Sequence, residues 1–253
     1  MKLMSYNILD GGEGRLDLII SAIKSESPDV LVINEANSFS ANGNKTLKLF
    51  SEKTGLPYYN IAPTEWGYDI AILSRLPFNK SEVLMPNKRA AFAVEIDSPF
   101  GPLSVIGLHL SPDSEINRLF EIKEIIDYQK KYENRIIMGD MNALSRQDDY
   151  SPKIIGGFNA KQTEKFTDKG KPLFDVVDTI LKSEYLDAAV QLKGNKETTV
   201  PTPSNRDIAH ADLRLDYIFI SESLASHIVD YKVVKNETTD KASDHYPIIV
   251  KLA

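Results

Sequence analysis

Short apolar runs bounded by turn residues recur along the whole chain, a pattern typical of buried strands. They predict strands at Lys2–Ile8, Asp29–Ile33, Tyr58–Ala62, Asp69–Ser74, Arg89–Ile96, Leu103–Leu108, Arg135–Met138, Leu213–Ile220, Val229–Val234 and Pro247–Leu252. The strands from Tyr58 to Leu108 follow one another with little room for crossover helices. This succession favours mixed or antiparallel sheets over a purely parallel one.

Helical spacing of apolar residues marks several segments between these strands. It predicts helices at Leu16–Ile23, Lys45–Lys53, Ser114–Lys131 and Phe174–Leu181. The clearest amphipathic pattern is Ser114–Lys131, whose expected buried face carries Ile116, Leu119, Ile122, Ile125 and Ile126. Strands interleaved with helices indicate an α/β protein built in layers. A sandwich of two mixed sheets with helices outside fits the length and the order of the elements.

The segment from Ser145 to Asn205 is less regular. It contains Gly156-Gly157, a lysine-rich stretch from Lys161 to Lys171, and a Pro-Thr-Pro run. A linker between two domains would have such a composition. We expect instead a long excursion from one domain spanning residues 1–253, because motifs on both sides of the segment point to one site.

Composition narrows the possible functions. The chain has 253 residues, 42% of them hydrophobic and 26% charged, which is ordinary for a globular protein. It has no cysteine, so disulfides, thiolate metal sites and a cysteine nucleophile are excluded. The net charge of -6 argues against a dedicated high-affinity DNA binder but not against a nuclease, because a carboxylate-rich site needs cations before it accepts a phosphate.

The chain has no apolar run near the ~20 residues of a membrane span, and its first residues turn polar too soon for a secretory signal. We therefore expect a cytoplasmic protein without stable membrane association, with a monomer as the favoured state. A secreted protein whose signal peptide had been removed would look the same.

Polar residues stand where the apolar strands end. Eight asparagine, carboxylate and histidine residues occupy these ends: Asn7, Glu35, His109, Asp140, Asn142, Asp216, Asp244 and His245. Ligand sites of layered α/β proteins collect at strand ends, where side chains leave the core on rigid backbone. Carboxylate, amide and imidazole groups suit a hard cation such as Mg²⁺ and the hydrolysis of a phosphate ester.

Six short motifs carry a resemblance to a known family. In order they are Tyr6-Asn7-Ile8, Ile33-Asn34-Glu35, Gly107-Leu108-His109, Gly139-Asp140-Met141-Asn142, Arg214-Leu215-Asp216-Tyr217 and Ser243-Asp244-His245. Together they resemble the endonuclease/exonuclease/phosphatase family of the deoxyribonuclease I-like superfamily, from residue 4 to residue 247. The resemblance implies a four-layer α/β sandwich and Mg²⁺-dependent cleavage of phosphate esters, with Mn²⁺ as a possible substitute.

The resemblance also implies a role for each motif residue. Glu35 resembles the principal metal carboxylate, with Asn7 beside it and Asp244 near the metal. Asp140 and Asn142 resemble the pair that orients the attacking water and contacts the phosphate. His245 and His109 resemble two phosphate-facing histidines, and Asp216 resembles the hydrogen-bonded partner of His245. Which of Asp140 and His245 takes the water proton stays open.

The substrate stays open as well. His109 stands where apurinic endonucleases carry a tyrosine-centred motif, which disfavours abasic-site repair and favours the histidine branches of the family. A nuclease acting on DNA is the first expectation, and a sphingomyelinase-like or inositol phosphate phosphoesterase is the alternative. A non-catalytic binding protein would be expected to lose some of these positions. A glycosidase using Glu35 and Asp140 would leave the histidines without a role.

Several other residues allow two interpretations. Arg89 suits a phosphate contact, and a surface arginine is the plain alternative. The lysines at 161, 165, 169 and 171 fit a solvated loop, or a lid over the substrate. Trp66 fits packing or stacking on a substrate, and Asp69 fits support of the site or a strand end. His227 is expected to be structural, and His210 is undecided.

Overall fold

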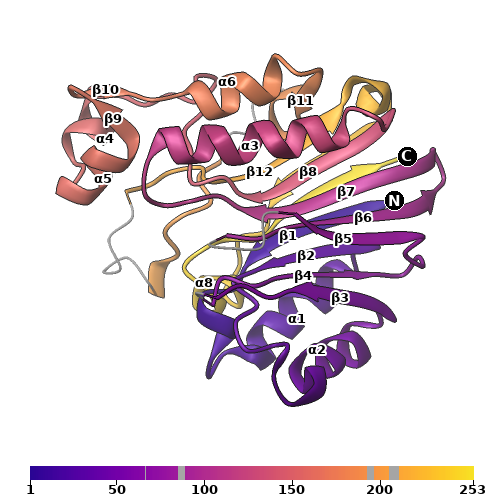
Figure 1. Ribbon diagram of the computed structural model, residues 1–253. Helices are drawn as coiled ribbons and strands as arrows, with labels where there is room; N and C mark the ends of the chain where they lie inside the picture. Colours follow the sequence, from indigo (N-terminus) through magenta and orange to yellow (C-terminus); the bar gives the residue numbers. More distant parts are fainter. Residues whose placement is uncertain (66, 85–88, 193–196, 205–210) are drawn as a thin grey trace.

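Two six-stranded sheets lie face to face in the computed structural model, which describes residues 1–65, 67–84, 89–192, 197–204 and 211–253 (Figure 1). The first sheet has the order β13 (Ile228–Val233), β14 (Ile248–Leu252), β1 (Lys2–Asn7), β2 (Val30–Asn34), β4 (Ile70–Ser74), β3 (Tyr58–Ala62). The second has the order β11 (Tyr185–Asp187), β12 (Asp216–Ser221), β8 (Asn134–Asp140), β7 (Gly101–His109), β6 (Ala91–Ser98), β5 (Lys80–Leu84).

Both sheets are mixed, as the strand succession predicted. β1 pairs with β2 in parallel and β7 with β8 in parallel, while the neighbouring pairs run antiparallel. Strand bounds differ from the predicted ones by a few residues at most. β5 was not predicted, because Lys80–Leu84 is an edge strand of largely exposed and charged residues and lacks an apolar run.

Helices cover the outer face of each sheet. α1 (Leu16–Glu26) and α2 (Ala41–Thr54) pack on the first sheet, and α3 (Glu115–Gln129) and α6 (Asp175–Leu181) on the second. The short elements are η1 (Asp10–Gly12), α4 (Pro152–Gly156), α5 (Ala160–Phe166), β9 (Thr167–Asp168), β10 (Lys171–Pro172), α7 (Ala188–Gln191), η3 (Glu222–His227) and α8 (Thr239–Ala242). The predicted four-layer sandwich is confirmed. None of the described helices is long and apolar enough to cross a membrane.

Apolar residues from both sheets meet in the central layer. Val32 and Ile72 of the first sheet pack there with Val105 and Ile136 of the second, and all four are fully buried. Separate apolar clusters lie under the helices on each outer face. The alternation of side chains along the inner strands of each sheet therefore serves two cores, which explains why those strands read as continuous apolar runs.

The two sheets contact each other near the ends of β2, β7 and β8. Gly139 has φ 147°, and a Cβ on it would lie 1.9 Å from the carbonyl oxygen of Leu108. The side-chain amide of Asn34 donates to that same oxygen across the sheets. Only glycine fits between these groups, and the close approach brings the polar strand ends of both sheets together.

The buried face of α3 differs from the prediction. Ile122, Ile125 and Ile126 are buried, but Ile116 is 62% exposed and Leu119 is only partly buried. Arg118 is fully buried instead, bound to Glu115 by a 3.0 Å ion pair. The first turns of this helix use their inner face for a polar network, which apolar spacing alone does not reveal.

The segment 145–205 returns to the second sheet. Its β11 pairs with β12, and its α6 packs on α3. Its helices α4 and α5 and the small hairpin β9–β10 lie together beside the beginning of α3 (Figure 1). The division of the chain into one domain or two stays a prediction.

Candidate active site

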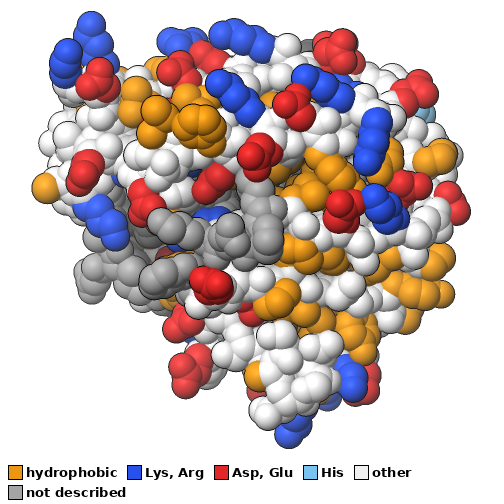
Figure 2. Space-filling model, in the orientation of Figure 1, with side chains coloured by type: hydrophobic (Ala, Val, Ile, Leu, Met, Phe, Trp, Pro, Cys, Tyr) orange, Lys and Arg blue, Asp and Glu red, His pale blue; other side chains and the backbone are white. Residues whose placement is uncertain are grey.

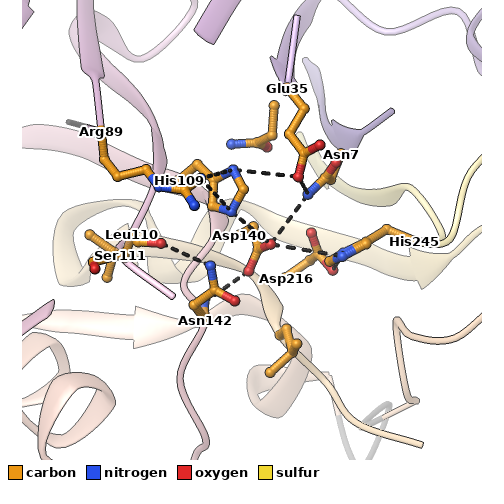
Figure 3. A network of polar contacts seen from close by, with 12 residues as sticks. Asn7, Glu35, Arg89, His109, Leu110, Ser111, Asp140, Asn142, Asp216 and His245 are labelled. Atoms are coloured by element: carbon orange, nitrogen blue, oxygen red, sulfur yellow. Dashed lines mark hydrogen bonds and ion pairs between the residues drawn. The ribbon is translucent and has the colours of Figure 1, made fainter. Parts of the chain in front are cut away.

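The polar strand ends of both sheets meet in one cavity of about 560 Å³. Asn7 ends β1, Glu35 follows β2, His109 ends β7 and Asp140 ends β8. Figure 3 shows these side chains pointing toward one another, together with Arg89, Asn142, Asp216 and His245. Asp244 also lines the cavity. The structure thus brings together every site residue that the sequence singled out.

Strand register aligns three of these residues in one row. Asp140 stands opposite Asp216 on one neighbouring strand and beside His109 on the other. Asp216 is the first residue of β12, so it opens this strand, whereas the predicted strand Leu213–Ile220 had placed it inside. The row crosses the ends of β12, β8 and β7 in the second sheet and faces Asn7 and Glu35 of the first.

Asp140 is the hub of the polar contacts. Its Oδ2 lies 3.3 Å from Nδ2 of Asn7, 3.3 Å from Nε2 of His109 and 3.8 Å from Nε2 of His245. Its Oδ1 accepts a hydrogen bond of 2.8 Å from the backbone N–H of Asn142. Burial alone would raise the pKa of Asp140, but the two histidines and Lys165 outweigh burial and lower it to about 2. The carboxylate is therefore ionised at neutral pH.

The two histidines differ in charge. Burial is the largest effect on the pKa of His109 and lowers it to about 3, which leaves a neutral imidazole. Burial also lowers the pKa of His245, but Asp216 and Asp244 outweigh it and raise that pKa to about 10. The Nδ1–H of His245 donates to Oδ2 of Asp216 over 2.8 Å. His245 is therefore held as an imidazolium, whereas His109 is held neutral.

Arg89 forms one wall of the cavity. Its Nη1 lies 3.2 Å from Nδ1 and 3.3 Å from Nε2 of His109, and its guanidinium stacks 3.4 Å from the centre of the Tyr68 ring. Arginine only donates hydrogen bonds, so neutral His109 can accept from Arg89 at Nδ1 and donate to Asp140 at Nε2. With 8% of its surface exposed, Arg89 is a buried cation beside the site and not a surface arginine.

Glu35 lies on strained backbone in the first sheet. Its φ of 59° falls in the left-handed region, which is uncommon for glutamate and is often found at functional sites. Its carboxylate accepts from the N–H of Asp10 over 2.9 Å and from Nδ2 of Asn7 over 3.2 Å. Asp69 supports the same turn, because its carbonyl oxygen accepts from the N–H of Ala36. Burial raises the pKa of Glu35.

Asn7 has a defined amide orientation. Its Nδ2 lies between the carboxylates of Glu35 and Asp140, and its Oδ1 accepts from the N–H of Leu9 over 3.1 Å. Carboxylates accept and a backbone N–H donates, so the opposite orientation would lose all three contacts. Asn7 thereby links the two sheets and fixes the spacing of the two carboxylates.

Lys165, for which the sequence allowed a solvated loop or a lid over the substrate, lies in the wall of the cavity. Residues 160–166 form α5, whose first turn is held by a capping box between Asn159 and Gln162. Lys165 is 9% exposed, lines the cavity, and donates from Nζ to Oδ1 of Asn142. The expectation of a solvated loop is therefore wrong for this lysine, whereas Lys169 is exposed in the β9–β10 turn.

The position of Lys165 is fixed from behind by a buried network. Nη2 of Arg118 donates to the carbonyl oxygen of Lys165 over 2.7 Å, and Nη1 donates to that of Ser111 over 3.1 Å. Glu115 holds the same guanidinium and also accepts from the N–H of Val176 over 3.1 Å. The segment 145–205 is thus bound to α3 at the point where it supplies a cation to the site.

Both polar atoms of the Asn142 side chain are engaged with the protein in this arrangement. Its Nδ2 donates to the carbonyl oxygen of Leu110 over 2.8 Å, while its Oδ1 accepts from Lys165. Lysine only donates and a carbonyl only accepts, which sets the amide orientation. Like Glu35, Asn142 has a positive φ, of 47°. Lys165 is thus the cation beside Asn142 in the cavity wall.

His227 is the one other histidine among the described residues. His227 is outside the cavity, where its Nδ1 lies 2.8 Å from the carbonyl oxygen of Ala253 and its ring packs against Phe100. This agrees with the structural role expected for it. His210 and Trp66 fall outside the described residues.

Solved structures with the same fold cover this whole chain. An endonuclease/exonuclease/phosphatase from Beutenbergia cavernae DSM 12333 matches with a TM-score of 0.71 and 20% identity, over 100% of this chain and 72% of that one. An AP endonuclease from Archaeoglobus fulgidus has a TM-score of 0.75 and 19% identity, over 100% and 99%. A 3′ phosphatase from Neisseria, bound to a product DNA hairpin, has a TM-score of 0.73 and 16% identity, over the same shares. At these identities the likeness establishes the fold.

The sequence comparison establishes the family. No curated protein matches the chain. Residues 4–245, however, match the profile described as the Endonuclease/Exonuclease/phosphatase family, and this range contains all six motifs. The protein therefore belongs to the endonuclease/exonuclease/phosphatase family, as its motifs predicted.

Proposed function

We propose that this protein is a divalent-metal-dependent phosphodiesterase, with DNA as the first expected substrate. The proposal rests above all on Asp140, an ionised buried carboxylate in contact with His109, Asn7 and, at 3.8 Å, the imidazolium of His245. Phosphodiester hydrolysis needs an acceptor for the proton of water and a donor for the leaving oxygen. Asp140 and His245 supply these two groups within one cavity.

The oxygen ligands of the site fit Mg²⁺. Among the described residues, no three or more His, Cys, Asp or Glu side chains converge into a complete metal site. Mg²⁺ does not require one, since it is commonly held by one or two carboxylates together with water and substrate phosphate. Glu35 is the first candidate ligand, with Asp244 near it and Asn7 ordering its carboxylate. When bound, the ion would neutralise charge on the phosphate, and Mn²⁺ could replace it.

The proton transfers follow from the contacts. Hydrolysis forms a bond between the water oxygen and phosphorus and breaks the bond from phosphorus to one ester oxygen. Asp140 is placed to accept the proton of the water. His245, oriented by Asp216, is placed to give its Nε2 proton to the departing oxygen. The flanking carboxylates that keep His245 protonated favour Asp140 over His245 as the base.

Two cations suit the phosphate itself. Arg89, just before β6, and Lys165, on α5, are both buried, so each can donate to a non-bridging oxygen in a site with little water. Neutral His109 lies between Arg89 and Asp140 and holds both in place. These donors support a mechanism in which charge on the transition state is stabilised by preorganised side chains.

Two observations bear on DNA as the substrate: the solved structures with the same fold, and the distribution of charged side chains on the surface. The Neisseria relative holds a product DNA hairpin, and the Archaeoglobus relative is an AP endonuclease. On the face drawn in Figure 2, the described Lys and Arg side chains are interspersed with Asp and Glu and form no continuous basic patch. A face of this kind adds little non-specific attraction to DNA, since that attraction comes from clustered Lys and Arg.

A cleavage screen tests the proposal. Plasmid DNA, RNA, sphingomyelin and a phosphoinositide are each incubated with the protein in Mg²⁺. We expect cleavage of DNA, its loss with a chelator and its return with Mg²⁺ or Mn²⁺. The variant His245→Ala should lose activity, whereas His227→Ala, which changes a histidine outside the cavity, should keep it. Chelator-resistant cleavage, or full activity of His245→Ala, would overturn the mechanism, and preference for a lipid would replace the substrate.

A further inference from the structure

A second cavity of about 530 Å³ adjoins the candidate active site. The two cavities share Tyr68, Arg89 and Pro112. Volumes in this range are those of pockets that enclose a small organic group. A substrate whose phosphate lies in the first cavity therefore has a ready space for one of its ester groups in the second.

Arg89 stands at the boundary between the cavities. It contacts His109 of the active site through Nη1 and stacks on the Tyr68 ring at 3.4 Å. A phosphate bound by this guanidinium in the first cavity would leave one of its two ester groups free to enter the second cavity. The position of Arg89 thus relates the two cavities as parts of one substrate site.

The first two turns of α3 form the outer wall of the second cavity. Phe120 lines it and is 67% exposed. Ligand pockets are commonly lined by apolar and aromatic side chains together with a few polar groups. Pro112 supplies a second apolar contact on the shared side. A flat, partly apolar group fits such a wall, because it can stack on the ring.

The polar groups of the second cavity favour one class of ligand over others. Asp113 and Glu121 bring carboxylates to it, and Oε2 of Glu121 accepts from the N–H of Ser111 over 2.8 Å. Two carboxylates would repel a second phosphate. Against a fatty chain they would lose water without gaining a partner. A ring with exocyclic amino groups, in contrast, offers hydrogen-bond donors to both.

We propose that the second cavity binds the nucleobase on one side of the scissile phosphate, stacked on Phe120 and donating from an amino group to Asp113 or Glu121. This subsite rests on the proposed phosphodiesterase function and names its substrate class as a nucleic acid with an unpaired base beside the cleavage point. Stacking of a base on an aromatic ring corresponds to about tenfold or more in binding.

Dinucleotides that lack one base test the subsite. The substrates are d(ApA), the two versions in which one adenine is replaced by an abasic tetrahydrofuran, and bis(p-nitrophenyl) phosphate as a simple diester. Removal of the base on one particular side should lower kcat/KM of the wild-type protein about tenfold. In Phe120→Ala that penalty should vanish. Ile116→Ala is the matched control, because Ile116 is an exposed residue one turn earlier on α3 that does not line the cavity.

The outcomes separate the two proposals. Failure of the wild-type protein to hydrolyse any diester in Mg²⁺ or Mn²⁺ would remove the proposed function itself. Hydrolysis of d(ApA) with no penalty for either missing base would remove the subsite alone. The subsite is likewise overturned if Phe120→Ala keeps the penalty, if Ile116→Ala abolishes it, or if Phe120→Ala impairs only the cleavage of phospholipid vesicles.

Discussion

The Nζ of Lys165 donates a hydrogen bond to Oδ1 of Asn142, joining α5 to a loop residue just beyond the catalytic candidate Asp140. Both side chains are buried, at 9% and 4% exposed. The bond consumes the amide oxygen of Asn142 and leaves Lys165 with two further N–H donors for an anion in the cavity. An element outside the motifs therefore contributes directly to the candidate site.

Replacement of Lys165 should impair catalysis more than folding. Lys165→Met keeps the apolar stem but removes the donor, and loss of one transition-state donor typically lowers the rate about 100-fold. We expect a loss of that order in kcat/KM on DNA, with thermal unfolding little changed. Lys123→Met is the control, since Lys123 is exposed on α3 and does not line the cavity. Equal activity of Lys165→Met and the wild type would exclude a role in the site.

The charge of Lys165 should also appear in the pH profile. Burial lowers the pKa of Lys165 to about 8, although Asp140 draws it upward. The protonated form is the donor, so kcat/KM should fall as pH rises through about 8. Lys165→Arg, whose guanidinium stays charged, should remove this decline while retaining part of the activity. An unchanged alkaline decline in Lys165→Arg would assign it to another group.

Asp216→Asn should disable the His245 pair. The carboxylate of Asp216 orients His245 through a 2.8 Å hydrogen bond and stabilises its positive charge. Because an acid or base group in place is typically worth about 100-fold or more, we expect a loss of that size in kcat. The control is Asp230→Asn on the exposed side of β13. Near-normal kcat in a folded Asp216→Asn protein would show that this pair is dispensable.

Glu35→Gln should weaken the binding of the metal ion. The new side-chain amide can still accept from the N–H of Asp10 but has lost the charge that attracts the cation. The Mg²⁺ concentration for half-maximal activity should rise about tenfold or more. Titration of activity with Mg²⁺ measures it, with Glu52→Gln on the exposed face of α2 as control. An unshifted Mg²⁺ curve would place the ion elsewhere.

Gly139→Ala should destabilise the whole fold. A Cβ at Gly139 would lie 1.9 Å from the carbonyl oxygen of Leu108, at a φ of 147° that side chains rarely adopt. We expect a loss of about 4 kcal/mol or more in the free energy of unfolding, measured with denaturant. Gly156→Ala, at the end of α4 with nothing within 4 Å of the added atom, should change it by less than about 1 kcal/mol. Similar values for both variants would contradict the close contact of Gly139 on β8 with Leu108 on the neighbouring strand β7.

Most of the framework was predictable from the sequence, because strand and helix signals are local. Tyr58–Ala62 was predicted with its observed bounds, and the four-layer order followed from the succession of elements. The edge strand Lys80–Leu84 was missed, since a strand exposed at an edge carries no apolar run. Ile116 was misplaced because the inner face of its helix is partly polar.

The polar residues at the strand ends, among them Asn7, Glu35, Asp140 and His245, are visible in the local sequence pattern, since each lies next to an apolar run that anchors it. The charge of each group, in contrast, follows only from the folded arrangement, because pKa values depend on burial and on neighbours far away in the chain. The tertiary structure alone brought Lys165 beside Asn142, Arg89 beside His109, and Phe120 to the rim of the second cavity. Such contacts join distant segments, and no local pattern records them.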